Sequence, residues 1–167
     1  MDNGVSLNGS PDTQGTCPLV ASLSMHYNNH CIGAMGMEMA MYEIKIESSF
    51  SGAHRLRGYD GQCENLHGHN WKVEVFISSS ELGEDGMVLD FRKLREATQA
   101  VLEALDHRYL NEIPYFAEIN PSSENIAKYI FDRLKDRLEG IHARLTKVTA
   151  WESASACASY YEDYDNA

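Results

Sequence analysis

Alternating apolar and polar residues predict two strands in the middle of the chain. Residues 42–47 read YEIKIE and residues 71–77 read WKVEVFI, so every second position is apolar in both. Successive side chains of a strand point to opposite faces, and this period of two therefore indicates strands with one buried face. The loop between them, at 57–64, is rich in glycine and polar residues.

Two helices are predicted next, because apolar residues recur at a spacing of three to four. Asp90 is a suitable N-cap for the first helix and Ser122 or Ser123 for the second, while Gly140 follows the second helix. The first apolar stripe consists of Phe91, Leu94, Ala97, Val101 and Leu105, and the second of Ile126, Ile130, Leu134 and Leu138.

Residues 145–151 and 156–161 predict two more strands, giving the order β-β-α-α-β-β. Hairpins at both ends with two helices between them imply an α+β domain, an antiparallel sheet with both helices on one face. Four strands leave two open edges, which invite pairing with another chain. We therefore expect a homo-oligomer that closes the sheet.

The first 40 residues lack either period, and we interpret 1–40 as a flexible leader and 41–167 as one domain. Within the leader, His26, His30 and Cys31 could bind a metal, but nothing nearby would fix their geometry.

Overall composition excludes several classes of protein. The formal net charge is −11, with 25 acidic and 14 basic residues, which disfavours nonspecific binding of nucleic acid. Apolar runs are far shorter than the roughly 18 residues of a membrane span. The four cysteines form no C-x-x-C pair, and a disulfide framework is not expected in a chain with this much core. We expect reduced thiols, no membrane segment and a cytoplasmic protein.

The strongest chemical pattern is C-x-x-x-H-G-H, formed by Cys63, His67, Gly68 and His69. Two histidines two apart on a strand share a face, and His54 comes opposite them if the two strands form a hairpin. Three imidazoles leave one tetrahedral position open, as in catalytic zinc sites, although iron, copper or nickel also suit them. A solvated polar face is the alternative.

Other candidates are less specific on their own. Cys63 is a base, a nucleophile, a fourth metal ligand or a small buried residue. Asp106 and His107 are adjacent, and a carboxylate can orient an imidazole and raise its basicity. Glu152 can accept two hydrogen bonds from an aminopyrimidine edge, or it is a solvated charge at a strand end.

Six segments in this order resemble the family of 6-pyruvoyltetrahydropterin and 6-carboxytetrahydropterin synthases. The segments are FSGAH (50–54), CENLHGHNW (63–71), GMVLDF (86–91), LDHRYLN (105–111), NPSSENIA (120–127) and WES (151–153). The resemblance runs from about residue 42 to 162 and leaves out the leader.

The resemblance implies the tunnelling fold, with three protomers closing a barrel and two trimers forming a hexamer. Zinc would be bound by His54, His67 and His69. Cys63 would be the base, assisted by Asp106 and His107. Glu152 would anchor the pterin ring, close to Ser122, Ser123 and Glu124.

The implied reaction converts 7,8-dihydroneopterin triphosphate to 6-carboxy-5,6,7,8-tetrahydropterin, with release of acetaldehyde and triphosphate, toward 7-deazaguanine and queuosine. The compact spacing before His67 favours this branch over the 6-pyruvoyl branch. A zinc-binding protein without activity is a further alternative. One departure is Trp151, where family members often carry Lys or Arg before the ring-binding Glu.

Overall fold

The computed structural model describes residues 41–162. The predicted leader lies outside the described residues, and so does the alternative metal site of His26, His30 and Cys31. Within the described range, no helix is long and apolar enough to cross a membrane.

The two strands predicted from alternation form a long hairpin. β1 (Tyr42–His54) and β2 (His67–Ser79) pair antiparallel along their whole length, and His54 lies directly opposite His67. Both strands run beyond the alternating stretches, because backbone pairing continues where serine, glycine, asparagine and histidine replace apolar residues. This extension of the hairpin carries all three histidines.

A second hairpin completes the sheet on the other side of β2. β4 (Arg144–Ser153) pairs antiparallel with both β2 and β5 (Ala156–Tyr161), and the strand order is β3-β1-β2-β4-β5. β3 (Arg108–Tyr109), which the sequence did not predict, pairs parallel with β1. A strand of two residues has no periodicity to detect, so its position depends on tertiary contacts alone.

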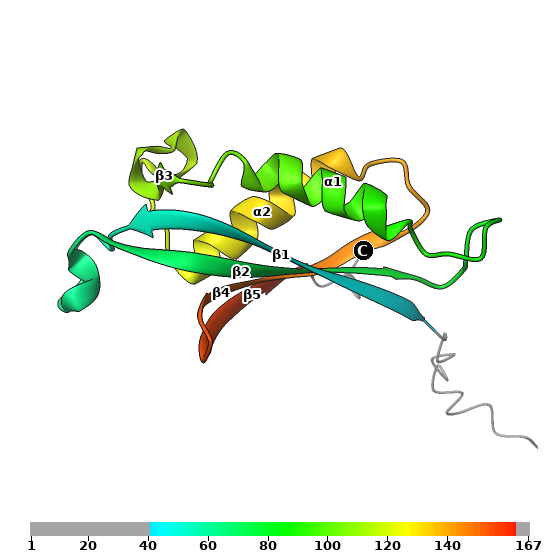
Figure 1. Ribbon diagram of the computed structural model, residues 1–167, viewed down its shortest axis with the longest axis horizontal. Helices are drawn as coiled ribbons and strands as arrows, with labels where there is room; N and C mark the ends of the chain where they lie inside the picture. The colour runs from blue at the N-terminus through cyan, green and yellow to red at the C-terminus, as the bar shows by residue number, and fades with distance from the viewer. Residues whose placement is uncertain (1–40, 163–167) are drawn as a thin grey trace, which may run out of the picture. The chain divides into compact units, whose positions relative to one another are not determined.

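Both helices cover the same face of the sheet, and the predicted α+β arrangement is confirmed (Figure 1). α1 (Phe91–Leu102) begins after Asp90, whose carboxylate accepts a hydrogen bond from a backbone N–H of the first turn. α2 (Ser123–Arg137) begins after Ser122, whose hydroxyl caps it in the same way. The loops contain short 3-10 helices at Gln62–Glu64, Leu110–Glu112 and Pro114–Phe116.

The core lies between the helices and the sheet. Leu94 and Val101 of the predicted stripe are buried, but Phe91 is 51% exposed and Leu105, which is buried, lies beyond the end of α1. Phe91 is the first residue of the helix. The predicted apolar stripe is therefore longer than the part of the helix that packs on the sheet. The sheet contributes Ile46, Phe50, Trp71, Val73, Val75, Ile77, Val148 and Ala150.

The other face of the sheet carries a polar network centred on Glu74. Its carboxylate accepts hydrogen bonds from Trp151 at 3.0 Å, Lys45 at 3.0 Å and Lys72 at 3.4 Å. Burial alone would raise the pKa of Glu74, but these hydrogen bonds outweigh it and hold the pKa at about 2. Nζ of Lys72 also lies 4.4 Å from the ring centroid of Trp151. The position where members of the similar family often carry Lys or Arg is thus occupied by Trp151, with the ammonium group of Lys72 beside its ring.

Candidate metal and substrate site

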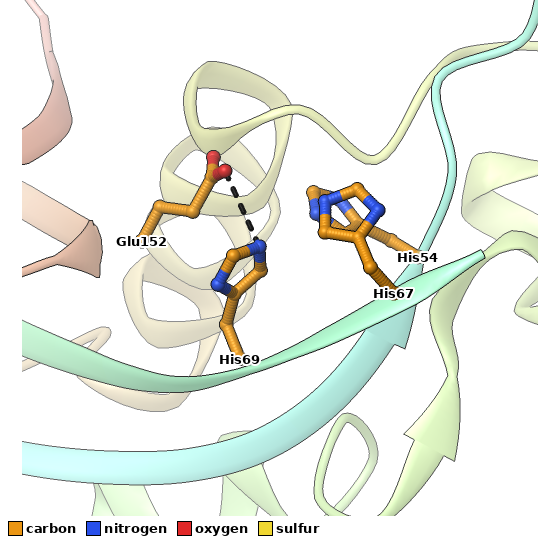
Figure 2. A group of neighbouring side chains, drawn as sticks. All are labelled: His54, His67, His69 and Glu152. Atoms are coloured by element: carbon orange, nitrogen blue, oxygen red, sulfur yellow. Dashed lines mark ion pairs between the residues drawn. The ribbon is translucent and has the colours of Figure 1, made fainter. Parts of the chain in front are cut away.

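Three histidines meet at the end of the first hairpin where the loop 55–66 joins the two strands (Figure 2). His67 and His69 continue the row of β2 side chains that includes buried Trp71, and His54 reaches the same face from β1. The ring centroids are 4.5 Å apart for His54 and His67, 4.9 Å for His67 and His69, and 5.3 Å for His54 and His69. The predicted sharing of one face is confirmed.

Backbone carbonyl groups orient two of these rings. Nδ1 of His54 lies 2.7 Å from the carbonyl oxygen of Pro121, and Nδ1 of His67 lies 2.7 Å from that of Asn65. A carbonyl oxygen only accepts, so each Nδ1 carries the proton and each Nε2 keeps a lone pair. This pairing of one ring nitrogen with a carbonyl is the usual outer support of a metal-binding histidine.

The remaining ring nitrogens have the character of metal ligands. Nε2 of His54 and Nε2 of His69 are buried without a hydrogen-bond partner in the described part of the chain. A buried polar atom without a partner is costly, and a bound ion removes that cost. Burial lowers the pKa of His54, which keeps its imidazole neutral and able to bind a cation. The three histidines therefore fit a metal ion that imidazole nitrogens can bind.

Glu152 joins the same group of atoms. One carboxylate oxygen of Glu152 and one nitrogen of each histidine all lie within 4.8 Å of one another. Oε1 of Glu152 is 3.3 Å from Nε2 of His69, and the hydroxyl of Ser123 donates a hydrogen bond of 2.9 Å to Oε2. From the family resemblance, Glu152 was expected to bind the pterin ring and not the metal. In the structure its carboxylate contacts both Ser123 and His69.

Cys63 lies in the 3-10 turn between the two strands of the hairpin. Its thiol is free and half-buried, and its carbonyl oxygen accepts a 2.8 Å hydrogen bond from the N–H of Leu56, which closes the loop. Among the described residues, the metal-binding group takes in Glu152 and leaves out Cys63. The fourth-ligand interpretation of Cys63 thus has no support from the geometry of the chain.

Asp106 and His107 form a contact of their own at the edge of β1. Oδ2 of Asp106 is 2.9 Å from Nδ1 of His107, and Oδ1 accepts a 2.8 Å hydrogen bond from the N–H of Ser51. The hydrogen bond from Ser51, followed by the one from His107, lowers the pKa of Asp106. His107 has a φ of 54°, unusual for a residue other than glycine, and its N–H donates to the carbonyl oxygen of Ser51 at 2.6 Å.

Within one chain, the pair makes no direct contact with the three histidines, although His107 and His69 border the same hollow. His107 borders a hollow of about 500 Å³, together with Arg108, Tyr109 and the strand segments 51–53 and 68–70. Over the described residues, no hydrogen bond, ion pair or ring contact joins Asp106 or His107 to His54, His67 or His69. His107 is 81% exposed at its side chain and is available to another molecule.

The remaining predicted residues lie at the start of α2. Ser122 caps the helix, Ser123 contacts Glu152, and Glu124 is exposed in the first turn. Sequence reasoning missed the residues that hold this segment against the loop that follows β1. The side chain of Asn120 pairs with both backbone groups of Arg57, at 2.8 and 3.0 Å, and so fixes the segment that carries Pro121.

A family model described as 6-pyruvoyl tetrahydropterin synthase matches residues 43–163. The chain belongs to this family. It is an enzyme of the tetrahydropterin synthase type, and the match begins and ends close to the limits of the sheet.

Individual relatives carry different names. The 6-carboxy-5,6,7,8-tetrahydropterin synthase of Aquifex aeolicus is 32% identical over 125 residues, 61% of this chain and 77% of that protein. The protein of the same name from Synechocystis sp. is 35% identical over 127 residues, 72% and 94% of the two chains. A dihydroneopterin monophosphate aldolase of Pyrococcus furiosus is 36% identical over 109 residues, 65% and 88%.

A solved structure shares the fold. The 6-pyruvoyl tetrahydropterin synthase of Caenorhabditis elegans superposes with a TM-score of 0.67 at 32% identity, covering 75% of this chain and 98% of that one. The family and the fold are therefore established, and the relatives differ in the reaction that they are named for.

Proposed function

We propose that this chain, with a bound zinc ion, converts 7,8-dihydroneopterin triphosphate and water to 6-carboxy-5,6,7,8-tetrahydropterin, acetaldehyde and triphosphate. The observation that carries the metal part is the pair of buried Nε2 atoms of His54 and His69, which have no hydrogen-bond partner among the described residues. The product is supported by the compact C-x-x-x-H-G-H spacing and by relatives named for this reaction.

Each side chain has a distinct role in this proposal. His54, His67 and His69 would hold the zinc, and the ion would supply a Lewis acid for oxygens of the substrate side chain, so that a neighbouring C–H would become more acidic. Cys63 would be the base that accepts the proton from that carbon. Cys63 is half-buried in the loop before His67, and its thiol is free.

The contact between Asp106 and His107 suits a proton relay. Asp106 stays ionised, because the N–H of Ser51 and the ring of His107 favour its charged form. Through Nδ1 it fixes the tautomer of His107 and leaves Nε2 free to accept or return a proton. Since the pair has no contact with the histidines of its own chain, it would serve the site of a neighbouring protomer.

The pterin ring would be recognised by Glu152. Its two carboxylate oxygens can accept hydrogen bonds from the amino group and the adjacent ring N–H of the aminopyrimidine. Ser123 already holds one of these oxygens, and Ser122 and Glu124 flank it at the start of α2.

The same proposal includes a homohexamer of two trimeric barrels and a cytoplasmic location, where Cys63 stays reduced. It places the product on the route to 7-deazaguanine and queuosine. Open strand edges on β1 and β5 support the closure of a barrel between copies.

Product analysis tests the assignment. Zinc-loaded protein is incubated with 7,8-dihydroneopterin triphosphate, and the pterins and volatile aldehydes are measured by mass spectrometry. Equal amounts of 6-carboxytetrahydropterin and acetaldehyde are expected. A 6-pyruvoyl product without acetaldehyde would contradict the carboxy assignment, and a phosphorylated two-carbon aldehyde would indicate aldolase chemistry. Unchanged substrate would show that the chain lacks this activity.

A further inference from the structure

Two asparagine side chains pair with the stretch of chain that follows β1. The amide of Asn111 accepts a hydrogen bond from the N–H of Arg55 and donates one to the carbonyl oxygen of Arg55, both at 2.9 Å. Asn120 pairs with Arg57 in the same way, at 2.8 and 3.0 Å. Residues two apart on a strand present their backbone groups to the same side, and Arg55 and Arg57 show this pattern. The two asparagines thus stand where a neighbouring strand would pair.

Asn111 continues the register of β3. β3 pairs parallel with β1, with Ala53 opposite Tyr109, an offset of 56 positions (Figure 1). Asn111 and Arg55 are separated by the same 56 positions. Directly after β3 the chain turns into the 3-10 helix Leu110–Glu112, so its backbone leaves the strand. The side chain of Asn111 therefore supplies the next pair of hydrogen bonds.

The same stretch holds Cys63 through the residue between the two arginines. The N–H of Leu56 donates a 2.8 Å hydrogen bond to the carbonyl oxygen of Cys63. Leu56 thus bonds to the loop rather than to the asparagines, as alternate residues of a strand point to opposite sides. Residues 55–57 therefore link the asparagines to the 3-10 turn Gln62–Glu64, which carries Cys63.

Arg57 and Asn125 brace this arrangement. Nη2 of Arg57 donates hydrogen bonds of 2.6 Å to the carbonyl oxygens of Phe116 and Ile119, in the segment between the two asparagines. Nδ2 of Asn125, in the first turn of α2, donates a 2.8 Å hydrogen bond to the carbonyl oxygen of Asn120. The stretch after β1 is thus tied to the start of α2 as well as to the end of β3.

The loop 55–66 needs such support. It is longer than the two to five residues that usually join a hairpin, and it has to satisfy its backbone groups without a regular ladder. Asn111 and Asn120 are both half-buried, and they supply four of the required hydrogen bonds. A side chain that takes part in catalysis has to be held within about 0.5 Å of its working position. The support of this loop therefore bears on Cys63.

We propose that Asn111 and Asn120 are positioning residues. Their side chains stand in for a neighbouring strand, fix residues 55–57 and, through the N–H of Leu56, fix the turn that carries Cys63. The effect on turnover rests on the proposed function, in which Cys63 is the base. The effect on the loop does not depend on that function.

The first experiment compares amide hydrogen exchange in the wild-type chain and in Asn111→Ala, both zinc-loaded and without substrate. The N–H of Leu56 should exchange at least about tenfold faster in the variant, because two hydrogen bonds that hold its stretch are lost. The N–H of Val75, in the middle of β2, should keep its rate and so report an intact fold. An unchanged rate at Leu56 would overturn the proposal.

Thr98→Ala is the matched control for a general loss of stability. It removes a buried hydroxyl that donates a 2.8 Å hydrogen bond to the carbonyl oxygen of Leu94, inside α1. The exchange rate of Leu56 should stay within about twofold of the wild type, because local opening of the loop does not involve α1. Exchange at Leu56 as fast as in Asn111→Ala would mean that the asparagine has no specific effect, and would overturn the proposal.

The second experiment is a double-mutant cycle with Cys63, measured as single-turnover rates. Asn111→Ala should lower the rate roughly tenfold to a hundredfold, since a displacement of about 1 Å costs up to that much. In a Cys63→Ala background the same substitution should change the residual rate less than about twofold, because the group to be positioned is gone. A merely structural role would lower both rates by the same factor, and that result would overturn the proposal.

Asn120→Ala is a second, independent variant. Asn120 directly precedes Pro121, whose carbonyl oxygen lies against the ring of His54, so its loss should weaken zinc binding as well as turnover. Asn111→Ala should keep the zinc content of the wild type. Equal loss of zinc in both variants would show that the asparagines act on the metal ligands, and would overturn the assignment to Cys63.

The exchange experiment is independent of turnover, so the two proposals can fail separately. A chain whose exchange at Leu56 responds to Asn111→Ala, but which makes no 6-carboxy product, would contradict the proposed function alone. A chain that makes the product while exchange at Leu56 is unchanged in Asn111→Ala would contradict only this inference.

Discussion

Nδ1 of His54 lies 2.7 Å from the carbonyl oxygen of Pro121, a residue 67 positions further along the chain. The contact joins the end of β1 to the segment that leads into α2. Because Pro121 directly precedes Ser122, the N-cap of α2, one segment fixes both the ring of His54 and the helix that carries Ser123. The metal ligands and the carboxylate of Glu152 are thus positioned by the same part of the fold.

Replacing His67 by alanine should remove the metal. Two imidazoles and a carboxylate remain, and the loss of one of three histidines should leave the purified protein with far less than one zinc per chain. Zinc content by elemental analysis, beside turnover, gives the result. His142→Ala, at an exposed position outside the site, should keep full metal. A metal-free, fully active His67→Ala protein would refute the metal assignment.

Cys63→Ala should separate binding from chemistry. The histidines are untouched, so zinc content should stay near that of the wild type, while turnover should fall by roughly two to four powers of ten, the usual contribution of a positioned base. Single-turnover rates measure the loss. Cys157→Ala, an exposed thiol on β5, is the control and should be fully active. Zinc lost in proportion to activity would identify Cys63 as a ligand instead.

The network around Glu74 predicts a pH-dependent stability. Its pKa is lowered from 4.5 to about 2, so the charged carboxylate stabilises the fold above pH 4.5, and this stabilisation is lost as the pH falls toward 2. Glu74→Gln should therefore lower the free energy of unfolding at pH 7, and the difference from the wild type should shrink in acid. Urea unfolding in the presence of a chelator measures both.

Glu47→Gln is the matched control for this experiment. Glu47 also pairs with Lys45, at 2.8 Å, but both side chains are largely exposed, and exposed ion pairs contribute little. Its free energy of unfolding should stay close to that of the wild type at either pH. A Glu74→Gln defect of the same size at pH 7 and below pH 3 would mean that ionisation is not its source.

The open edges of the sheet predict assembly. β3 covers only Gly52 and Ala53 of β1, and β5 has no partner beyond β4 within the described residues. Unpaired backbone groups along both edges favour pairing with further copies, and light scattering should give six times the 18.8 kDa of one chain. A monomer at micromolar concentration would rule out the barrel.

The sequence predicted the hairpin, the caps of both helices and the shared face of His67 and His69, because these depend on local periodicity and on backbone hydrogen bonds at helix ends. The opposition of His54 and His67 followed from the hairpin alone and is confirmed. The apolar stripe predicted for the first helix included Phe91, but this residue is 51% exposed at the first position of α1.

Contacts between segments that are far apart in the sequence could not be predicted from local periodicity or helix caps. β3 is too short to have a period, and the carbonyl oxygens of Asn65 and Pro121 carry no side-chain signal at all. The approach of Glu152 to His69 depends on β4 lying beside β2, an adjacency that the order of elements does not specify. The residue types indicated which side chains can bind a metal or a substrate, whereas the order of the strands in the sheet determines which of these side chains lie close together.

His67 and His69 continue the row of β2 that runs through Trp71, Val73 and Val75, so the candidate metal site is the last layer of the hydrophobic core. The indole ring of Trp71 packs against two of the candidate ligands, with its centroid 5.2 Å from that of His54 and 5.5 Å from that of His69. If local opening of the hairpin end limits release of the ion, a chelator would strip it at a rate that saturates with chelator concentration.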